Sequence, residues 1–338
     1  MNIKNYIYTI SFLVIALLFN ACKSDTTEPI NSSGMSLVAT ANTPGYAQDV
    51  VIYQQGINYA FIADDNSGLQ IINVSNPSVP IYVTGYNTAG NASDVKVASI
   101  NGRAYAFVAD GTAGWSIIDV DQPSQPFLDT VITFSNDNVI CSFIELSTRR
   151  AYIGTYNRMY IYDISTLPNA VTQLSSYYSA DNLNAIWAEG GVAYLAQNTA
   201  GVELVNVVNP SYPAYISAFN TPGYAMDIDI AEGHYAYIAD WNSMIVIDVV
   251  NPFNPVPVGT YYNTNSQFTA LTYNNNGVFY SAEGPQGIET IGVGTPTSPV
   301  QLGYYNTTDF AGGVAASGNY VFVADGNSGL VILSYTTK

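Results

Sequence analysis

Three aspartates recur along the chain, each at the start of a short apolar stretch: Asp49, Asp94 and Asp227, with Asn184 in a fourth such place. Two carboxylates on one face of a protein can serve as the acid and base of a glycosidase, and carboxylate oxygens also bind cations. In neighbouring repeats, Asp49 and Asp94 would lie on the order of 8 Å apart and repel by about 2 kcal/mol at an effective dielectric of 20. That repulsion favours a bound cation, although water also relieves it. Asp49 and Asp94 are therefore weak candidates for metal ligands, no metal site is assigned, and no cofactor is expected.

Aromatic side chains accompany these acids. Tyr46 and Tyr224 lie in matching TPGYA segments, Phe310 has a similar place in TTDFAGG, and Trp241 directly follows an acid. Exposed rings beside Asn and Asp commonly hold glycans and peptides, because a ring offers a large apolar area at low entropic cost. The alternative is that the rings pack between repeats. The candidate ligand-binding residues are Tyr46, Tyr224, Trp241, Phe310, Asp49, Asp94 and Asp227.

The chain lacks the residue types that most catalytic sites need. Its only histidine, His234, lies in the turn AEGHYA, which we expect on the face opposite the acids. The sequence has no glycine-rich phosphate loop, no zinc-ligand cluster and no nucleophile elbow. No catalytic residues are therefore assigned, and the protein is not expected to be an enzyme.

A repeated phrase organises the chain around these residues. IADDNSGLQIINVSNPSVP at 62–80 returns as VADGTAGWSIIDVDQPSQP at 108–126 and as IADWNSMIVIDVVNPFNP at 238–255. The residue that ends the first apolar stretch recurs every 42 to 46 positions, a period typical of repeat architectures. Where this residue is an acid, we expect it to accept hydrogen bonds within its own turn. The count predicts seven copies, with this position at Asp64, Asp110, Thr155, Gln197, Asp240, Glu283 and Asp325.

Each copy reads as four short strands. In the first copy, the segments 49–54, 58–63, 69–74 and 81–86 are rich in β-branched and aromatic residues and are bounded by Gly, Asn, Asp or Pro. No segment after residue 22 has a sustained helical period, so helix should be nearly absent. Units that are apolar on both faces need a neighbour on each side, and a ring supplies both. The predicted fold is an all-β, seven-bladed β-propeller with four-stranded antiparallel blades.

The two ends of the repeat region complement each other. The seventh copy stops after its third strand at 329–335. The segment 36–41, which precedes NTPGY, parallels 214–219, which precedes a second NTPGY. We therefore predict that strand 36–41 completes the last blade and closes the ring.

The first 22 residues do not belong to the repeats. Lys4 precedes an apolar run at 10–19 that is too short to span a bilayer, and Asn-Ala-Cys follows it. This pattern resembles a bacterial lipobox, in which Cys22 becomes the lipid-modified first residue; plain secretion is the alternative. The predicted organisation is a signal peptide at 1–21, a flexible tether at 22–35 and the propeller at 36–338. The residues after Cys22 resemble a signal for sorting to the outer membrane, where the protein could face either side. The lipid on Cys22 would make the membrane a partner.

Charge narrows the choice of partners. The formal net charge is −17, so the surface repels phosphate backbones and nucleic acid is excluded as a partner. Three of the eight Lys and Arg residues lie in the third copy: Arg149, Arg150 and Arg158. We expect them either to neutralise nearby acidic side chains or to form a docking patch. We expect Cys141 and Trp187 to be buried in the core.

The core of the repeated phrase, [LI]-x-I-[IV]-[DN]-V-x-[NQ]-P-x-x-P, resembles the LVIVD repeat family of bacterial and archaeal β-propellers. The third copy departs most, since IYDISTLPNA lacks the second proline. The resemblance covers residues 36–338 and implies a cell-surface or periplasmic propeller, but it supplies no catalytic residues.

The functional hypothesis is a non-catalytic, lipid-anchored propeller of the cell envelope that binds a glycan, a peptide or an envelope protein. One alternative is an enzyme that acts on polysaccharide through carboxylates on one face. Another is an architectural subunit of an envelope complex.

Overall fold

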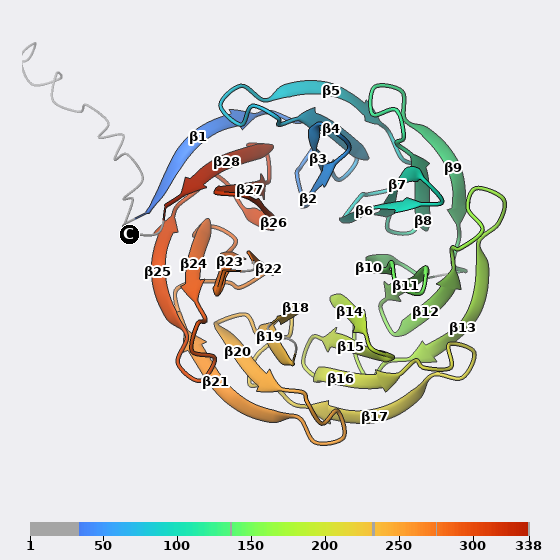
Figure 1. Ribbon diagram of the computed structural model, residues 1–338, viewed down its shortest axis with the longest axis vertical. Coiled ribbons are helices and arrows are strands. Elements are labelled where there is room, and N and C mark those ends of the chain that lie inside the picture. Colours follow the sequence, from blue (N-terminus) through green and yellow to red (C-terminus); the bar gives the residue numbers. More distant parts are fainter. Residues whose placement is uncertain (1–33, 136, 232–233, 275, 337–338) are drawn as a thin grey trace, which may run out of the picture. The chain divides into compact units, whose positions relative to one another are not determined.

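A computed structural model describes residues 34–135, 137–231, 234–274 and 276–336. They form seven four-stranded antiparallel sheets arranged as the blades of a β-propeller (Figure 1). Helices are absent from these residues, and none of them belongs to a helix that could cross a membrane. The predicted fold class and the blade count are confirmed.

Within each blade the strands follow the chain from the central channel outward. Blade 1 contains β2 (Asp49–Gln54), β3 (Asn58–Ala63), β4 (Leu69–Asn73) and β5 (Ile81–Tyr86). Blade 2 contains β6 (Asp94–Ile100), β7 (Arg103–Ala109), β8 (Trp115–Asp119) and β9 (Phe127–Ile132). Blade 3 contains β10 (Val139–Glu145), β11 (Arg150–Thr155), β12 (Arg158–Asp163) and β13 (Thr172–Tyr178). Blade 4 contains β14 (Ala185–Glu189), β15 (Val192–Gln197), β16 (Gly201–Asn206) and β17 (Ala214–Phe219). Blade 5 contains β18 (Asp227–Ala231), β19 (Tyr235–Ala239), β20 (Ser243–Asp248) and β21 (Val256–Tyr262). Blade 6 contains β22 (Ala270–Tyr273), β23 (Val278–Ala282), β24 (Ile288–Gly292) and β25 (Val300–Tyr305). Blade 7 contains β26 (Ala311–Ser317), β27 (Tyr320–Asp325) and β28 (Leu330–Tyr335), with β1 (Met35–Ala41) as its outer strand.

Strand β1 closes the ring, as predicted. It pairs antiparallel with β28, and Ser36 lies opposite Ser334, with 2.8 Å between their hydroxyl oxygens. The strand begins one residue earlier than expected, at Met35, which is buried. The hydroxyl of Thr290 in blade 6 donates to the Met35 sulfur at 3.1 Å. One sheet therefore contains the first and last strands, and the β28 edge is covered.

Apolar side chains on both faces of the middle strands fill the space between blades. Phe61 of β3 lies in one buried cluster with Val95 and Val108 of blade 2. The next residue, Ile62, points the other way and lies in a cluster with Phe322 of blade 7. Successive residues of a strand alternate in this manner, and burying a side chain of this size contributes about 1.5–3 kcal/mol. Each blade is thus stabilised by both of its neighbours.

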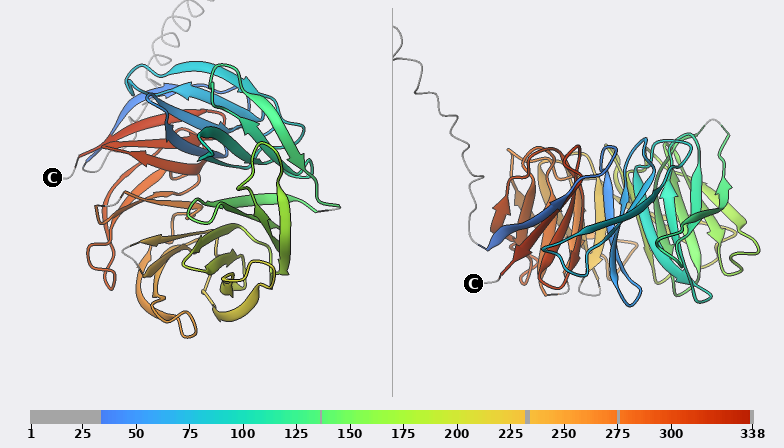
Figure 2. Two further views of the ribbon diagram at one scale, coloured as in Figure 1. Left: turned by 45° about the vertical axis from the view of Figure 1, so that its right-hand side comes forward. Right: turned by 90° about the horizontal axis from the view of Figure 1, so that it is seen from above.

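The loops fall on two opposite ends of the ring (Figure 2). One end, here called the mouth face, has the starts of the inner strands, the turns between the second and third strands, and the loops from blade to blade. His234 lies in the turn between β18 and β19, at the opposite end of β18 from Asp227. The candidate residues therefore share the mouth face and the only histidine does not.

Candidate functional site

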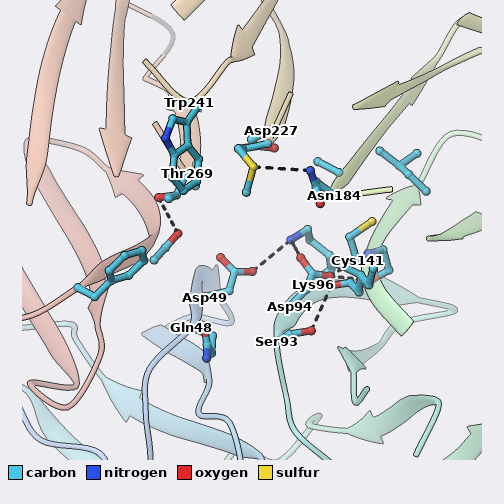
Figure 3. A pocket seen from close by; sticks show the side chains of 18 residues that line it. Gln48, Asp49, Ser93, Asp94, Lys96, Cys141, Asn184, Asp227, Trp241 and Thr269 are labelled. Carbon is cyan, nitrogen blue, oxygen red and sulfur yellow. Dashed lines mark hydrogen bonds and ion pairs between the residues drawn. The ribbon is translucent and has the colours of Figure 1, made fainter. Parts of the chain in front are cut away.

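A cavity of about 360 Å³ opens at the mouth face of the channel. Inner strands and blade-to-blade loops from around the ring supply its lining (Figure 3). Five of the seven candidate ligand-binding residues lie in this lining: Asp49, Asp94, Asp227, Trp241 and Phe310.

A lysine separates the two aspartates that the sequence places in neighbouring blades. Lys96 lies on β6 two residues after Asp94, so both side chains point to the same side of the strand. Its Nζ lies 3.3 Å from Asp49 Oδ2 and also contacts Asp94 Oδ1 (Figure 3). The cation that the repulsion between these carboxylates was expected to favour is therefore supplied by the chain itself. Lys96 was not among the residues expected at this site, although its place two residues after Asp94 on one strand puts both side chains on the same side.

Burial and neighbouring charges together determine the protonation of Lys96 and Asp94. Burial alone would lower the pKa of Lys96, but the charges of Asp49 and Asp94 outweigh it and raise the pKa above its ordinary value. Burial raises the pKa of Asp94 to about 6, although Lys96 opposes the increase. Lys96 is therefore charged across the physiological range, while Asp94 releases its proton close to neutral pH.

The aspartates also join neighbouring inner strands. The backbone N–H of Val95 donates to Asp49 Oδ2 at 3.1 Å, and that of Leu271 donates to Asp227 Oδ2 at 2.7 Å. Ser142 donates to Asp94 Oδ2 from its backbone N–H at 2.9 Å and from its hydroxyl at 3.0 Å. The innermost strand of a blade has one edge without a sheet partner, so its N–H groups need other acceptors. These carboxylates thus have a structural role beside any role in binding.

A second acidic residue, Asp229, lies along β18 two residues after Asp227. The carboxylate of Asp229 accepts the backbone N–H of Tyr273 at 3.1 Å, which repeats the Asp227 bond one step deeper in the channel. Burial raises the pKa of both Asp227 and Asp229 to about 7, against the effect of their backbone hydrogen bonds. This side of the channel therefore exchanges protons near neutral pH.

Aromatic rings form part of the rim. Tyr224 meets the Trp241 ring edge to face, with centroids 6.0 Å apart, and 47% of Tyr224 is exposed. Trp241 has a left-handed backbone with φ of 58°, and its carbonyl accepts the backbone N–H of Phe268 at 2.7 Å. Tyr46 is not in the cavity lining and lies beside Gly326 of blade 7. The structure thus joins Tyr224 to the site through Trp241 and leaves Tyr46 apart from it.

A second cavity of about 370 Å³ lies deeper along the channel. Trp187 lines it, with its ring 4.9 Å from that of Phe143. The indole nitrogen of Trp187 has no hydrogen-bond acceptor among the described residues. Trp187 packs against the buried cluster of blades 4 and 5, as expected for a core residue, and it also lines this cavity. Cys141 is buried as expected, and burial raises the pKa of its thiol.

In blades 1 and 2, the acid that ends the second strand fastens the loop that enters the blade. Asp64 accepts the hydroxyl of Thr43 at 2.6 Å and the backbone N–H of Gly45 at 2.7 Å. Asp110 accepts the hydroxyl of Thr88 at 2.6 Å. Both partners lie in the loop that enters the blade, about 20 residues upstream, and not in the acid's own turn as expected. We call this arrangement the loop clamp, and its role is structural.

The predicted lipidation site and signal peptide are outside the part of the chain that the structure describes. Cys22 and the signal segment 1–21 lie outside the described residues, as does most of the tether at 22–35. In the described part of the chain, no group of three or more His, Cys, Asp or Glu residues could hold a metal ion.

Comparison with known families finds the LVIVD repeat in five stretches of the chain, at residues 44–88, 89–132, 182–221, 222–264 and 310–333. Together these stretches cover more than half of the sequence. Blades 3 and 6 lie outside them. A search of curated proteins finds no match.

Solved structures share the architecture at low sequence identity. "Structure of U3-55K" superposes with a TM-score of 0.72 at 11% identity, covering 90% of this chain and 99% of that chain. A chain of "Crystal Structure of Mitotic Checkpoint Complex" superposes with a TM-score of 0.71 at 11% identity, covering 90% of this chain and 96% of that chain. At this identity the similarity concerns the fold alone.

Proposed function

Because this chain belongs to the LVIVD repeat family of β-propellers, we propose that it is a non-catalytic binding module of the cell envelope, held at the membrane by a lipid on Cys22. The fold and the repeats are consistent with a binding or scaffolding role. The lipobox-like segment that ends at Cys22 supports the envelope location.

The cavity at the mouth face is the observation that carries the proposal. It gathers three aspartates and one lysine below a rim that includes Trp241 and Tyr224. Carboxylates attract a basic side chain, and an aromatic face adds a cation–π contribution of about 0.5–2 kcal/mol. The net charge of −17 also attracts a basic ligand at long range. We therefore propose that the ligand is a peptide segment of an envelope protein that presents Lys or Arg to this cavity.

The engagement of the carboxylates supports a binding role over a hydrolytic one. Asp49 shares one oxygen between Lys96 and a backbone N–H, and both oxygens of Asp94 are occupied. A general acid or base needs a carboxyl oxygen that can come within hydrogen-bond distance of the substrate. The enzyme alternative predicts glycan turnover that is lost in the double variant Asp49→Asn, Asp94→Asn.

A pull-down from envelope extracts tests the binding proposal, with a soluble protein that lacks residues 1–22 as bait. Basic peptides from the captured proteins are then titrated by calorimetry against the wild type and Trp241→Ala. We expect Trp241→Ala to weaken binding at least tenfold, which corresponds to about 1.4 kcal/mol. Phe253→Ala is the matched control, since Phe253 is 73% exposed but lies outside the cavity. Retention of the same peptides by Trp241→Ala, or capture of peptides without basic residues, would contradict the proposal.

The location is tested separately. Metabolic labelling with a fatty acid should modify the wild type and not Cys22→Ser, and protease treatment of intact cells reports which side of the outer membrane the propeller occupies. Crosslinking in whole cells distinguishes the architectural alternative, which predicts a single partner in fixed stoichiometry.

A further inference from the structure

Blade 3 lacks the loop clamp that blades 1 and 2 have, as does blade 4, where the Gln197 side chain donates to Glu203 of its own blade. Thr155 stands where blades 1 and 2 have Asp64 and Asp110. Its hydroxyl donates to the carbonyl of Arg158, within its own turn, at 3.0 Å. No hydrogen bond joins Thr155 to the described residues of the incoming loop at 133–138. The position that the clamp closes in those blades is therefore open in blade 3.

The turn glycine is also replaced in this blade. In blade 1 a Cβ at Gly68 would lie 2.4 Å from the backbone nitrogen of Thr88, so glycine lets the following loop lie directly on the turn. Arg158 has the corresponding place in blade 3, opposite Tyr178 of the outer strand. The long side chain of Arg158 therefore occupies the space in which, in blade 1, the following loop lies on the turn.

These two changes accompany a pocket of about 610 Å³ at the side of blade 3. Small-molecule sites commonly have volumes of about 300–1,000 Å³. The pocket lies between the incoming loop and the β12–β13 side of the blade. Its lining includes Phe134, Tyr156, Arg158, Tyr160, Gln173 and Tyr178.

Aromatic side chains dominate the apolar part of this pocket. Tyr178 is 68% exposed and Tyr156 is 50% exposed. The rings of Phe134 and Tyr160 pack together with centroids 4.6 Å apart, which holds Tyr160 in place at the pocket wall. Exposed rings in a fixed position can pack against the apolar face of a sugar ring.

The polar part of the pocket contains groups that have no ionic partner. The guanidinium of Arg158 lies 3.9 Å from the centroid of the Tyr178 ring, and one of its N–H groups donates weakly to Ser176 at 3.4 Å. No acid in the described part of the chain forms a salt bridge with Arg158. The expectation that Arg158 answers a local acid is therefore wrong. Asp137 also lines the pocket, so one cation and one anion face it and its local charge is balanced.

From this arrangement we infer that the blade 3 pocket is a second binding site, for a neutral oligosaccharide. Tyr178 and Tyr156 supply apolar surface, while Arg158, Asp137 and Gln173 donate and accept hydrogen bonds with hydroxyl groups. A polyanionic glycan is disfavoured, because the chain has a net charge of −17 and the charges of Arg158 and Asp137 balance within the pocket. The inference is independent of the proposed peptide site at the channel mouth.

A glycan array followed by calorimetry tests the inference, with cello-, xylo-, manno- and laminari-oligosaccharides as neutral probes and oligogalacturonate as the acidic probe. We expect at least one neutral series to bind, and Tyr178→Ala to weaken that binding at least tenfold. Arg158→Ser, which introduces the residue that blade 5 has at this position, should also weaken it. Melting temperatures should stay close to that of the wild type because Tyr178 is exposed and Arg158 is only half-buried.

Blade 5 offers a matched control. Tyr262 pairs with Ser243 in the register in which Tyr178 pairs with Arg158, and Tyr262 is 64% exposed, but it lines none of the pockets described above. Tyr262→Ala should change saccharide affinity less than twofold. The inference is overturned if no neutral oligosaccharide binds, if only oligogalacturonate binds, or if Tyr178→Ala and Tyr262→Ala have the same effect.

Discussion

Removal of the Lys96 ammonium should destabilise the propeller, and more so at alkaline than at acidic pH. Lys96→Met keeps most of the side-chain length and deletes only the charge between Asp49 and Asp94. Two opposite charges 3.3 Å apart, as Nζ and Asp49 Oδ2 are, attract by about 5 kcal/mol at an effective dielectric of 20. The side chains of Lys96, Asp49 and Asp94 are 35%, 20% and 13% exposed, so channel water screens part of this attraction.

The expected loss lies between two limits. Removing one partner of a fully buried ion pair costs about 3–5 kcal/mol, whereas exposed pairs contribute about 0–1 kcal/mol. For this partly exposed group we expect the free energy of unfolding at pH 8 to fall by about 2–3 kcal/mol. Lys96 holds down the pKa of Asp94, which is already about 6, so the variant should raise that pKa further. At pH 5 Asp94 is then protonated in the folded variant, the repulsion with Asp49 disappears, and the loss should be smaller.

Urea unfolding followed by tryptophan fluorescence measures the loss of unfolding free energy at pH 5 and at pH 8. The control is a double-mutant cycle with Asp49→Asn, which removes one of the two charges that Lys96 balances. The second substitution should restore part of the stability that Lys96→Met loses, with a coupling energy of about 1–2 kcal/mol. Equal stability of Lys96→Met and the wild type at pH 8, the same loss at both pH values, or a coupling energy near zero would refute the electrostatic explanation.

Three other outcomes are expected. Asp110→Ala, which leaves the Thr88 hydroxyl and a loop N–H without their acceptor, should lower the free energy of unfolding by about 1–3 kcal/mol in urea titrations, and an unchanged midpoint would contradict the loop clamp. Deletion of 34–41 uncovers the β28 edge and should cause aggregation visible by light scattering, whereas deletion of residues 1–33 alone should leave a monomer with native melting behaviour. Asp227 has a pKa of about 7 when folded and near 4 when unfolded, so the folded state binds the extra proton and stability falls as pH rises from 5 to 7. Asp227→Asn should remove about 2 kcal/mol of that pH dependence, and identical pH profiles of variant and wild type would show that burial does not raise this pKa.

The fold was predictable because its signals are local in the sequence. The 42–46 residue spacing from Asp64 to Asp325 counts the blades, since each blade repeats the same strands and turns. The likeness between 36–41 and 214–219 identified the closing strand, because an outer strand without its own blade has one place to pair. The sharing of the mouth face by Asp49, Asp94 and Asp227 also follows from strand order alone.

The chemistry of the channel depends on distances that the repeat does not encode. Blade tilt and channel width decide which inner-strand side chains meet, so only the tertiary structure places Lys96 between Asp49 and Asp94 and brings Trp187 to both the core and the channel cavity. The blade 3 pocket arises in the same way, from a missing clamp acid and a missing glycine whose partners lie in other segments of the chain. Periodicity determines backbone architecture because hydrogen bonding and strand alternation repeat along the chain, whereas contacts across the ring are made between residues that are far apart in sequence and close only once the ring has closed.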